Sequence, residues 1–315
     1  MPFANRMEYI LIIVNIITVP VLSPLAVGTI RKVKAVLQNR RGASIFQPYF
    51  DLMKLFHKSE VVSEDASWIF MTAPYVVCAS SITLAMLTPI VPIVSALSLQ
   101  SDIIAFISFA MIGTFFLSIS GLDTGNAFGD IGASREMTVA AIAEGGMLFS
   151  LFTVALIAGS TNMTKMLVAA HSVGGIHAVA LFVSGVAFFI VLLAENARYP
   201  FDNPSTHLEL TMIHEATIIE NSGIGLGLME WAAANKLFVY IIIFVNIFMP
   251  WGVSVPVGTL GILLYIIIVL VKVGITLIII ACIESMIPKL RFFKLPELLF
   301  TSYALGVTAL VMAIM

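Results

Sequence analysis

Charged side chains are scarce in this chain. Asp, Glu, Lys and Arg make up 11% of the 315 residues, hydrophobic residues make up 60%, and the mean hydropathy is +1.05. Because soluble domains carry about 25% charged residues, this composition excludes an ordinary soluble protein and indicates a polytopic membrane protein. The formal net charge of −2 gives no sign of nucleic-acid binding. No internal repeat is evident either, which disfavours a stand-alone secondary transporter built from two matching halves.

Cysteine is nearly absent. The two cysteines, Cys78 and Cys282, both fall within predicted membrane spans, and no Cys-x-x-Cys pair occurs. Thiols of this chain alone therefore cannot assemble an iron–sulfur cluster or a zinc site, and we expect neither a redox cofactor nor a metal here. The N-terminus also lacks the cleavage pattern of a signal peptide, so we expect the first helix to be retained.

Long apolar runs recur along the whole chain. A run of about 20 residues suffices for an α-helix to cross a hydrocarbon core of about 30 Å. We predict an all-α, polytopic integral membrane protein that forms a single membrane domain over residues 1–315, with amphipathic helices in its cytoplasmic loops. About eight transmembrane helices are expected, at residues 8–30, 68–95, 101–120, 136–158, 177–195, 237–254, 258–283 and 297–315.

Basic residues are distributed unequally between the two sides of these spans. The loops 31–66, 121–135, 196–236 and 284–296 hold 13 of the 16 Lys and Arg residues. The opposite side holds only Arg6 and Lys165, and Lys272 falls inside a span. Because cytoplasmic loops carry the excess of basic residues, we predict that these four loops are cytoplasmic. Both termini should then lie on the outer side of the cell membrane.

The first of these loops contains an amphipathic stretch. Phe46, Tyr49, Phe50, Met53 and His57 recur at helical spacing. This pattern predicts a short helix that lies along the membrane interface. Amphipathicity alone does not distinguish contact with lipid from contact with a partner protein, so both remain open.

Ionisable residues crowd behind the fifth predicted span, where charge close to lipid is expensive. If residues 205–220 form one helix, Glu209 and Glu220 share a face with Ile213 and Ala216, because eleven residues at about 100° each return to within about 20°. A proton relay and a set of solvated surface charges both fit this pattern. The crowded residues are Glu195, Arg198, Asp202, His207, Glu209, His214, Glu215 and Glu220.

The same segment contains the beginning of a zinc-protease pattern at His214 and Glu215. Position 218 is Ile, so the second histidine of that pattern is missing. On a straight helix His207 and His214 would lie about 10 Å apart, too far for a single ion. Metal binding is therefore disfavoured.

Two ionisable residues fall in the middle of predicted spans, Glu144 and Lys272. Both are proton-path candidates, because an ionisable group within a membrane is expensive to keep. The adjacent Gly145–Gly146 could admit a neighbouring helix or water. The alternative for each is an ion pair or hydrogen bond that ties helices together. Glu195 and Glu284 sit at span ends, where extension to the interface is the simpler explanation.

A glycine-rich loop precedes the fourth span at residues 121–136. Its spacing is not a nucleotide-binding fingerprint, because no strand comes before it. Asp123, Asp130, Arg135 and Glu136 could meet the 195–220 segment on the same side of the membrane and build a polar chamber there. Turn formation and helix capping are the alternative roles.

Short motifs occur in order on all four predicted cytoplasmic segments. They are Gln38-Asn-Arg-Arg-Gly42, Phe46-Gln-Pro-Tyr49, Asp51-Leu-Met-Lys-Leu-Phe56, Gly132-Ala-Ser-Arg-Glu136, Glu195-x-x-Arg198-x-Pro-Phe-Asp202 and Pro288-Lys-Leu-Arg291. With them the whole chain resembles the complex I subunit 1 family and its hydrogenase relatives. The stretch from Asp202 to Glu215 resembles the version found in group 4 membrane-bound [NiFe] hydrogenases and related ferredoxin-linked complexes. The quinone-reducing members usually carry an acid-rich loop there.

This resemblance implies a docking and coupling subunit without a redox centre of its own. It would hold a hydrogenase-like large subunit and iron–sulfur cluster subunits beside antiporter-like membrane subunits, with the [NiFe] centre and the clusters in those partners. Electron transfer would be linked to proton or sodium translocation. The same subunit in a complex that reduces a sulfur compound or a quinone is the alternative, and the terminal electron acceptor and the pumped ion stay open.

The resemblance also implies roles for particular residues. The charged passage of the family maps onto Glu144, Glu195, Arg198, Asp202, Glu209 and Glu215, and we add Lys272, Glu220, His207 and His214 from their chemistry. The mouth of the chamber and the surface that docks the soluble arm map onto Asp123, Asp130, Arg135, Glu136, Arg40, Arg41 and Arg291. No catalytic residue is expected.

Overall fold

The computed structural model describes residues 2–63, 65–90, 102–202, 212–252 and 258–315, with side chains from Ile17 onward. Throughout these ranges the chain forms helices, and the only bridge there is the isolated pair Asp102 and Asn162. The all-α prediction is therefore confirmed. The elements are α1 (Pro2–Leu37), α2 (Gln47–Phe56), α3 (Trp68–Leu87), α4 (Ile103–Leu122), α5 (Ala127–Ala158), α6 (Met163–Ala170), α7 (Ile176–Glu195), α8 (His214–Thr217), α9 (Gly223–Ile243), η2 (Phe244–Phe248), α10 (Gly258–Met286), η3 (Phe292–Lys294) and α11 (Leu295–Ile314).

Seven helical stretches in the described part of the chain are long and apolar enough to cross a membrane. They correspond to α3, α4, α5, α7, α9 with η2, α10, and η3 with α11. In addition, α1 is a helix of 36 residues that packs along α3, α9 and α10. The chain is thus a multi-pass membrane protein.

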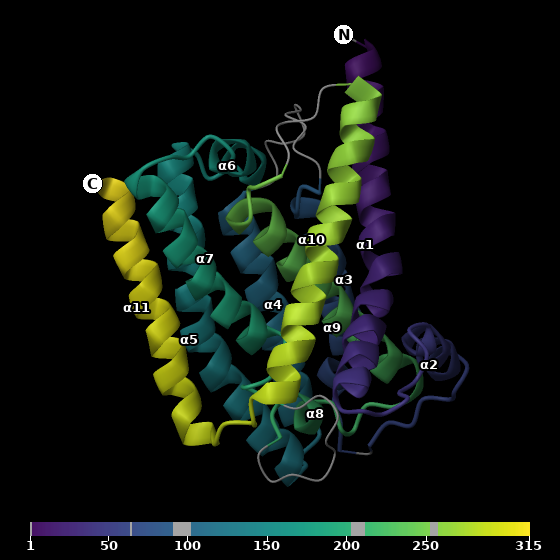
Figure 1. The fold of residues 1–315 in the computed structure, drawn as a ribbon. Coiled ribbons are helices and arrows are strands. Elements are labelled where there is room, and N and C mark those ends of the chain that lie inside the picture. Colours follow the sequence, from purple (N-terminus) through teal and green to yellow (C-terminus); the bar gives the residue numbers. More distant parts are fainter. Residues whose placement is uncertain (1, 64, 91–101, 203–211, 253–257) are drawn as a thin grey trace.

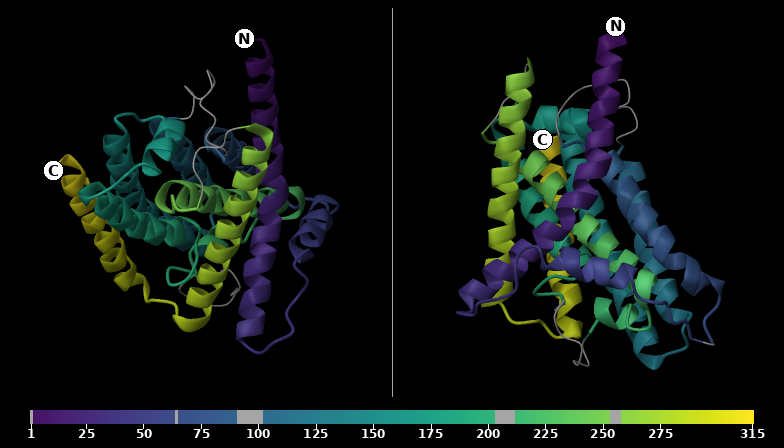
Figure 2. Two further views of the ribbon diagram at one scale, coloured as in Figure 1. Left: turned by 45° about the horizontal axis from the view of Figure 1, so that its top comes forward. Right: turned by 90° about the vertical axis from the view of Figure 1, so that its right-hand side faces the viewer.

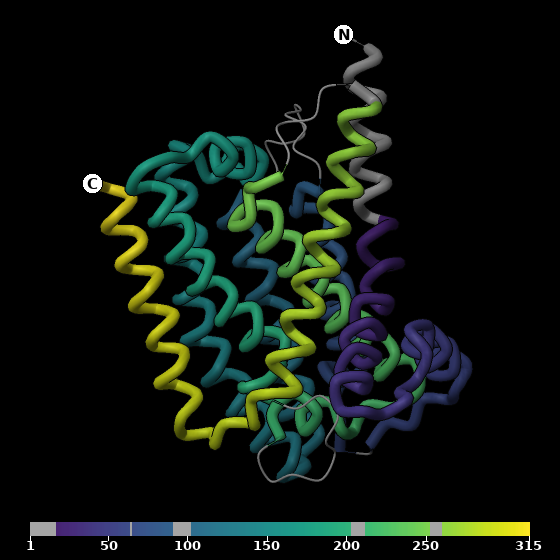
Figure 3. Tube along the Cα trace, viewed as in Figure 1, coloured from purple at the N-terminus to yellow at the C-terminus, as the bar shows by residue number. Residues whose placement is uncertain are grey.

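The helices form a bundle with two distinct ends (Figures 1 and 2). At one edge α1 and α10 run side by side, and at the opposite edge α11 packs against α5 and α7. Between these edges lie α3, α4 and α9, which pack on one another. One end of the bundle carries α2 and α8, and the other carries α6, the beginning of α1 and the end of α11. The trace in Figure 3 shows that the segment joining α10 to α11 lies at the α2 and α8 end.

Side-chain caps set where several helices begin. Ser67, Asp102, Asn126 and Asn162 each accept a hydrogen bond from a backbone N–H in the first turn of α3, α4, α5 and α6. Such caps satisfy N–H groups that have no partner within the helix. Because Asn126 caps α5, this helix starts nine residues before the predicted span 136–158 and takes in most of the predicted loop 121–135.

The contact between α5 and α11 depends on glycine. A Cβ atom at Gly146 would lie 2.8 Å from Ser302 Oγ, and one at Gly306 would lie 2.9 Å from Phe149 Cβ. At Gly145 the nearest atoms belong to the Tyr303 ring, at 3.3 Å. The prediction that the glycines beside Glu144 admit a neighbouring helix is therefore confirmed, and that helix is α11.

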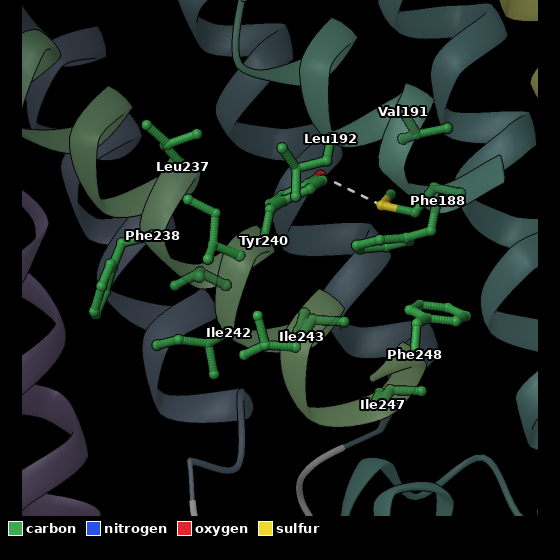
Figure 4. Packing of buried hydrophobic residues seen from close by; sticks show 14 of the residues in the cluster. Phe188, Val191, Leu192, Leu237, Phe238, Tyr240, Ile242, Ile243, Ile247 and Phe248 are labelled. Carbon is green, nitrogen blue, oxygen red and sulfur yellow. Dashed lines mark hydrogen bonds between the residues drawn. The ribbon is translucent and has the colours of Figure 1, made fainter. Parts of the chain in front are cut away.

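The aromatic part of the core surrounds the end of α9 (Figure 4). The ring of Phe188 on α7 stacks on Tyr240, with centroids 5.9 Å apart, and on Phe248, with centroids 5.1 Å apart. In a regular α-helix residues seven apart share a face, whereas these two are eight apart. The π-helix η2 lies between them and accommodates the extra residue.

Two predictions about the segments between the spans can be compared with the observed helices. The short helix expected around Phe46 to His57 is confirmed as α2, whose Phe46, Phe50 and Met53 side chains are exposed. The span predicted at 237–254 is wrong in its bounds, because the membrane-crossing stretch runs over Gly223–Phe248. Glycines and charged residues lower the hydropathy of its first half, and for this reason the part of α9 over residues 223–236 was assigned to the predicted loop 196–236.

Candidate functional site: a cluster of buried, paired charges

Three charged residues of the segment behind α7 are buried. Glu195, Arg198 and Asp202 are 8%, 7% and 2% exposed. Burial of an ion is costly unless a partner of opposite charge or several hydrogen bonds compensate for the lost water. Each of the three has such a partner, and each partner comes from a different helix or loop.

Glu195 pairs with a lysine from the middle of α9. The Nζ atom of Lys236 lies 2.7 Å from Glu195 Oε2 and donates a second hydrogen bond to Thr114 Oγ1 at 3.2 Å. The other carboxylate oxygen, Glu195 Oε1, is buried and has no hydrogen-bond partner in the described structure. One oxygen of a buried carboxylate therefore remains available to a water molecule or a proton.

Arg198 shares a carboxylate with α1. Glu284, near the end of α10, accepts from Arg198 Nη1 through Oε1 and from Lys34 Nζ through Oε2, both at 3.3 Å. The side chain of Glu284 is 2% exposed. This three-residue network joins α1, α10 and the turn behind α7, three segments that are far apart in the sequence.

Asp202 organises the segment that follows it. Its Oδ1 atom lies 2.6 Å from Lys289 Nζ, and its Oδ2 atom accepts from the backbone N–H groups of Ile213 and His214, both at 3.1 Å. A charged acceptor strengthens these hydrogen bonds. Asp202 therefore fixes both the start of α8 and the loop between α10 and α11.

The first turns of α5 contribute a further set of polar side chains. Arg135 Nη1 donates to the carbonyl of Met212 at 3.1 Å, and its guanidinium lies 5.4 Å from the centroid of the Phe292 ring. Glu136 lies next to it in the sequence and is partly buried. Of the four residues expected to meet the 195–220 segment, Arg135 does so through Met212.

Asp123 and Glu220 serve as hydrogen-bond acceptors at chain turns. The carboxylate of Asp123 accepts from the N–H groups of Ser67 and Phe70 at the start of α3. Glu220 accepts from the side-chain amide of Asn126. The contacts of Asp123 match the capping and turn alternative that the sequence left open for the 121–136 loop.

A cavity of about 150 Å³ lies within this cluster. Its walls come from α1, α2, α3, α4, α5, α9 and the segment around α8. Its lining includes the exposed Arg31 and Glu230 as well as the buried Glu195 and Arg198. The volume is enough for several water molecules. The charged residues in its lining are Arg31, Asp51, Glu136, Glu195, Arg198, Glu215, Glu230 and Lys236.

His214 and Glu215 face this cavity from α8. Burial lowers the pKa of His214 from its ordinary value of 6.5, and the negative charges of Glu215 and Asp202 oppose that shift. A histidine with a lowered pKa is neutral at pH 7. It can then both accept and donate a proton.

Other candidate residues lie away from the cluster. Lys272 donates a hydrogen bond to the carbonyl of Met249 at 2.7 Å. Arg40, Arg41, Asp130 and Arg291 are exposed. His207 and Glu209 lie outside the described residues. In the described part of the chain no group of three His, Cys, Asp or Glu side chains is placed to hold a metal ion.

Two sequence predictions about this region are wrong. A single helix over residues 205–220 does not form, because α8 ends at Thr217 and a turn follows up to Glu220. The carboxylate of Asp202 holds the start of α8 in place, and this contact cannot be seen in helical periodicity. Glu195 and Glu284 do not extend to the interface, because buried cations hold them inside the protein.

Sequence reasoning missed the cations that complete the cluster. Lys34, Lys236 and Lys289 were counted only as loop charges that set the orientation. For Lys236 a sequence pattern was present. Residues 238–248 are nearly all apolar, and apolar residues continue at helical spacing back to Leu228. Such an extension places Lys236 inside the span. No such sequence pattern indicates that Lys34 and Lys289 pair with buried carboxylates.

Residues 9–315 of the chain match the NADH dehydrogenase family. The chain belongs to this family. It is 32% identical to formate hydrogenlyase subunit 4 of Escherichia coli K12 over 290 residues, which cover 92% of this chain and 94% of that protein. It is also 32% identical to hydrogenase-4 component C of the same organism, over 91% of this chain and 90% of the relative.

A solved structure shows the same fold. One chain of the membrane-bound sulfane sulfur reductase, an archaeal respiratory membrane complex, superposes with a TM-score of 0.84 at 24% sequence identity. The alignment covers 97% of this chain and 99% of the reductase chain. The family and its relatives agree with the resemblance carried by the motifs between the spans, and the family assignment is thereby confirmed.

Proposed function

We propose that this chain is the membrane subunit of a ferredoxin-dependent, hydrogenase-type respiratory complex, where it anchors the soluble redox arm and couples electron transfer to ion translocation. Both relatives at 32% identity carry hydrogenase or hydrogenlyase names and match more than nine tenths of the chain. The partners would be a hydrogenase-like large subunit, iron–sulfur cluster subunits and antiporter-like membrane subunits. The [NiFe] centre and the iron–sulfur clusters would reside in these partners.

One observation carries the coupling role: a buried Lys236–Glu195 ion pair lines a cavity and leaves Glu195 Oε1 free to bind a proton. Glu136 lines the same cavity, and Glu144 lies two helical turns further along α5. Glu195 interacts electrostatically with both of these carboxyl groups. Titratable groups thus continue from the cavity into the membrane-spanning part of α5.

Charge in the soluble arm would act on this row of carboxyl groups. An electron that arrives close to the cavity raises the local negative potential and favours uptake of a proton by the nearest carboxylate. A bound proton then changes the charge that the neighbouring carboxyl groups experience. In this way electron transfer outside the membrane would shift protons within it, and the antiporter-like subunits would respond.

Docking of the arm would use the end of the bundle that carries α2 and α8. The exposed Arg40 and Arg41 follow α1, and Arg291 lies between α10 and η3. The exposed Asp130 lies in the first turns of α5. The excess of basic residues in these segments supports a cytoplasmic location for this end, and both termini would then face outward across the plasma membrane.

Metal analysis of the purified complex tests this proposal. The complex is isolated in mild detergent through an affinity tag on this subunit, and its nickel and iron contents are measured per mole of subunit. We expect about one nickel, together with the iron of the clusters. Iron without nickel would exclude the hydrogenase and shift the acceptor to a sulfur compound or a quinone. The absence of both metals from an intact complex would contradict the docking role.

A further inference from the structure

Lys236 is a cation within a membrane-crossing helix. It lies near the middle of the stretch Gly223–Phe248, and its side chain is 18% exposed. A charge at that depth is expensive, and groups of this kind are paired or functional. Its position in α9 could have been filled by an apolar residue, as are its neighbours Leu237 and Phe238.

The hydrogen bonds of Lys236 fix its ammonium group between two helices. One N–H points to Glu195 on α7 and another to Thr114 on α4. The Thr114 hydroxyl donates to the carbonyl of Ala110 at 3.2 Å, so its oxygen is free to accept from the lysine. An ammonium group has three donors. The third is therefore available to the cavity that Lys236 lines.

Several titratable groups surround this single ammonium. Besides Glu195, Lys236 interacts electrostatically with Glu136 and Glu144 on α5 and with His214 on α8. Its Nζ atom also lies 5.9 Å from the ring centroid of Tyr240 on its own helix. Arg198 and Asp202 also interact with His214, but each forms an ion pair of its own. Lys236 is thus a cation shared by three carboxyl groups, and its single positive charge balances the negative charge of only one of them at a time.

We infer that Lys236 is the positioning residue of the coupling site, an internal counter-ion that exchanges between Glu195 and the carboxyl groups of α5. When a proton binds Glu195 Oε1, the ion pair becomes a hydrogen bond between an ammonium and a neutral acid. The positive charge is then uncompensated and favours proton loss from Glu136 or Glu144. No atoms are exchanged apart from the proton, which enters at α7 and leaves from α5. This inference rests on the proposed function.

The test separates this role from structural support. Lys236→Gln, Lys236→Arg, Glu195→Gln and the double variant Glu195→Gln/Lys236→Gln are introduced into the intact complex. For each, three quantities are measured in inverted membrane vesicles: the yield of assembled complex, electron transfer from reduced methyl viologen, and ion translocation per electron. Translocation is followed both by a fluorescent pH dye and by uptake of radioactive sodium. Lys165→Gln, which changes an exposed lysine on α6, is the control.

We expect Lys236→Gln to lower the yield, because it leaves Glu195 buried without a counter-ion. The double variant should restore the yield, because both charges are removed. Translocation per electron should nevertheless remain at least about tenfold below wild type. Lys236→Arg keeps the charge and should keep translocation within about threefold of wild type. The control should match wild type in all three quantities.

Recovery of translocation together with yield in the double variant would show that the pair is only a structural element and would overturn the inference. Loss of translocation in an assembled Lys236→Arg complex would overturn it as well, and this second variant decides the question if the double variant fails to assemble. A wild-type complex that transfers electrons without moving ions would instead contradict the proposed function itself.

Discussion

Two lysines lie inside membrane-crossing helices, and their surroundings differ. Lys236 on α9 pairs with a carboxylate at 2.7 Å and lines a cavity that contains further acids. Lys272 on α10 donates to the backbone carbonyl of Met249, and its Nζ atom lies 5.1 Å from the ring centroid of Trp251. The first is therefore surrounded by titratable groups. The second fastens α10 to the turn behind η2, which matches the helix-tying alternative expected for it.

This difference shows that depth in the membrane does not by itself determine what an intramembrane lysine contacts. The sequence pointed to Lys272 because hydropathy placed it in a span, and it assigned Lys236 to a loop. What distinguishes the two is the presence of carboxylates around Lys236. Each of the following predictions changes either the charged cluster near Lys236 or the contacts of Lys272.

The largest effect is expected where a change in the charged cluster leaves cations without a partner. Glu284→Ala removes the carboxylate that both Arg198 and Lys34 contact. Unpaired buried charges of this kind cost about 3 kcal/mol or more. The thermal midpoint and the yield of the purified complex should fall sharply. Asp65→Ala, which removes an exposed carboxylate, should leave both unchanged. Equal stability of the two variants would contradict the ion-pair network.

A functional effect is expected further along α5. Glu144→Gln keeps the shape of the side chain and removes its titratable charge. Ion translocation per electron should drop by at least about tenfold, while assembly and metal content remain as in wild type. Vesicle assays with an artificial electron donor measure the first, and metal analysis measures the second. Unchanged translocation would remove Glu144 from the path.

Two acidic residues of the segment around α8 can be compared with each other in the same assay. Glu215→Gln changes a residue that lines the cavity, whereas Glu220→Gln changes one that accepts a hydrogen bond from Asn126. Turnover should fall more in the first variant than in the second. Two equal and negligible effects would favour the interpretation that these acids are solvated surface charges.

A smaller effect is expected for the second intramembrane lysine. Lys272→Met removes a hydrogen bond to a carbonyl and a contact with Trp251, but it leaves no carboxylate unpaired. Replacement of a buried charge by an apolar side chain of similar length changes stability by about 1 kcal/mol or less. Translocation per electron should be the same as in wild type. A loss as large as that of Glu144→Gln would remove the distinction between the two lysines.

The smallest effect is expected in the pH dependence of stability. His214 has a lowered pKa in the folded protein, so the unfolded chain binds the proton first as the pH falls. Its contribution to stability is complete above pH 6.5 and is lost as the pH falls from 6.5 through the folded pKa. His214→Gln should flatten the fall of the thermal midpoint in that window and change little at pH 8. Identical pH profiles for variant and wild type would show that His214 does not contribute.

Much of the fold could be predicted from local patterns. Hydropathy alone located the spans that became α3, α4, α7, α10 and α11, and amphipathicity located α2. These predictions depend on residues that are close in sequence. The start of α5 was missed because the charged residues of its first turns, among them Arg135, which contacts Met212, lower the local hydropathy.

The candidate site was predictable only in part, for a physical reason. Asp202, Arg198 and Glu195 could be recognised because they are crowded in the sequence. Their partners Lys289, Glu284 and Lys236 lie 87, 86 and 41 residues away. Pairing across such distances is decided by helix packing, which no local pattern encodes. The same limit explains why the start of α8 at His214 was missed, because the side chain of Asp202, which lies outside the helix, holds it in place.

The π-helix η2 has a consequence for how α9 tolerates change. It forms the last turn of this helix, behind the part that carries Lys236, and it ends at Phe248. Deletion of one residue within Phe244–Ile247 would convert η2 into regular α-helix and leave Phe248 seven residues from Tyr240, a spacing that keeps both on one face. Phe248 would then keep its stack on Phe188, and the residues before Phe244 would keep their orientation. In evolutionary terms, this turn is a place where the helix can gain or lose one residue without moving Lys236 or breaking the aromatic stack.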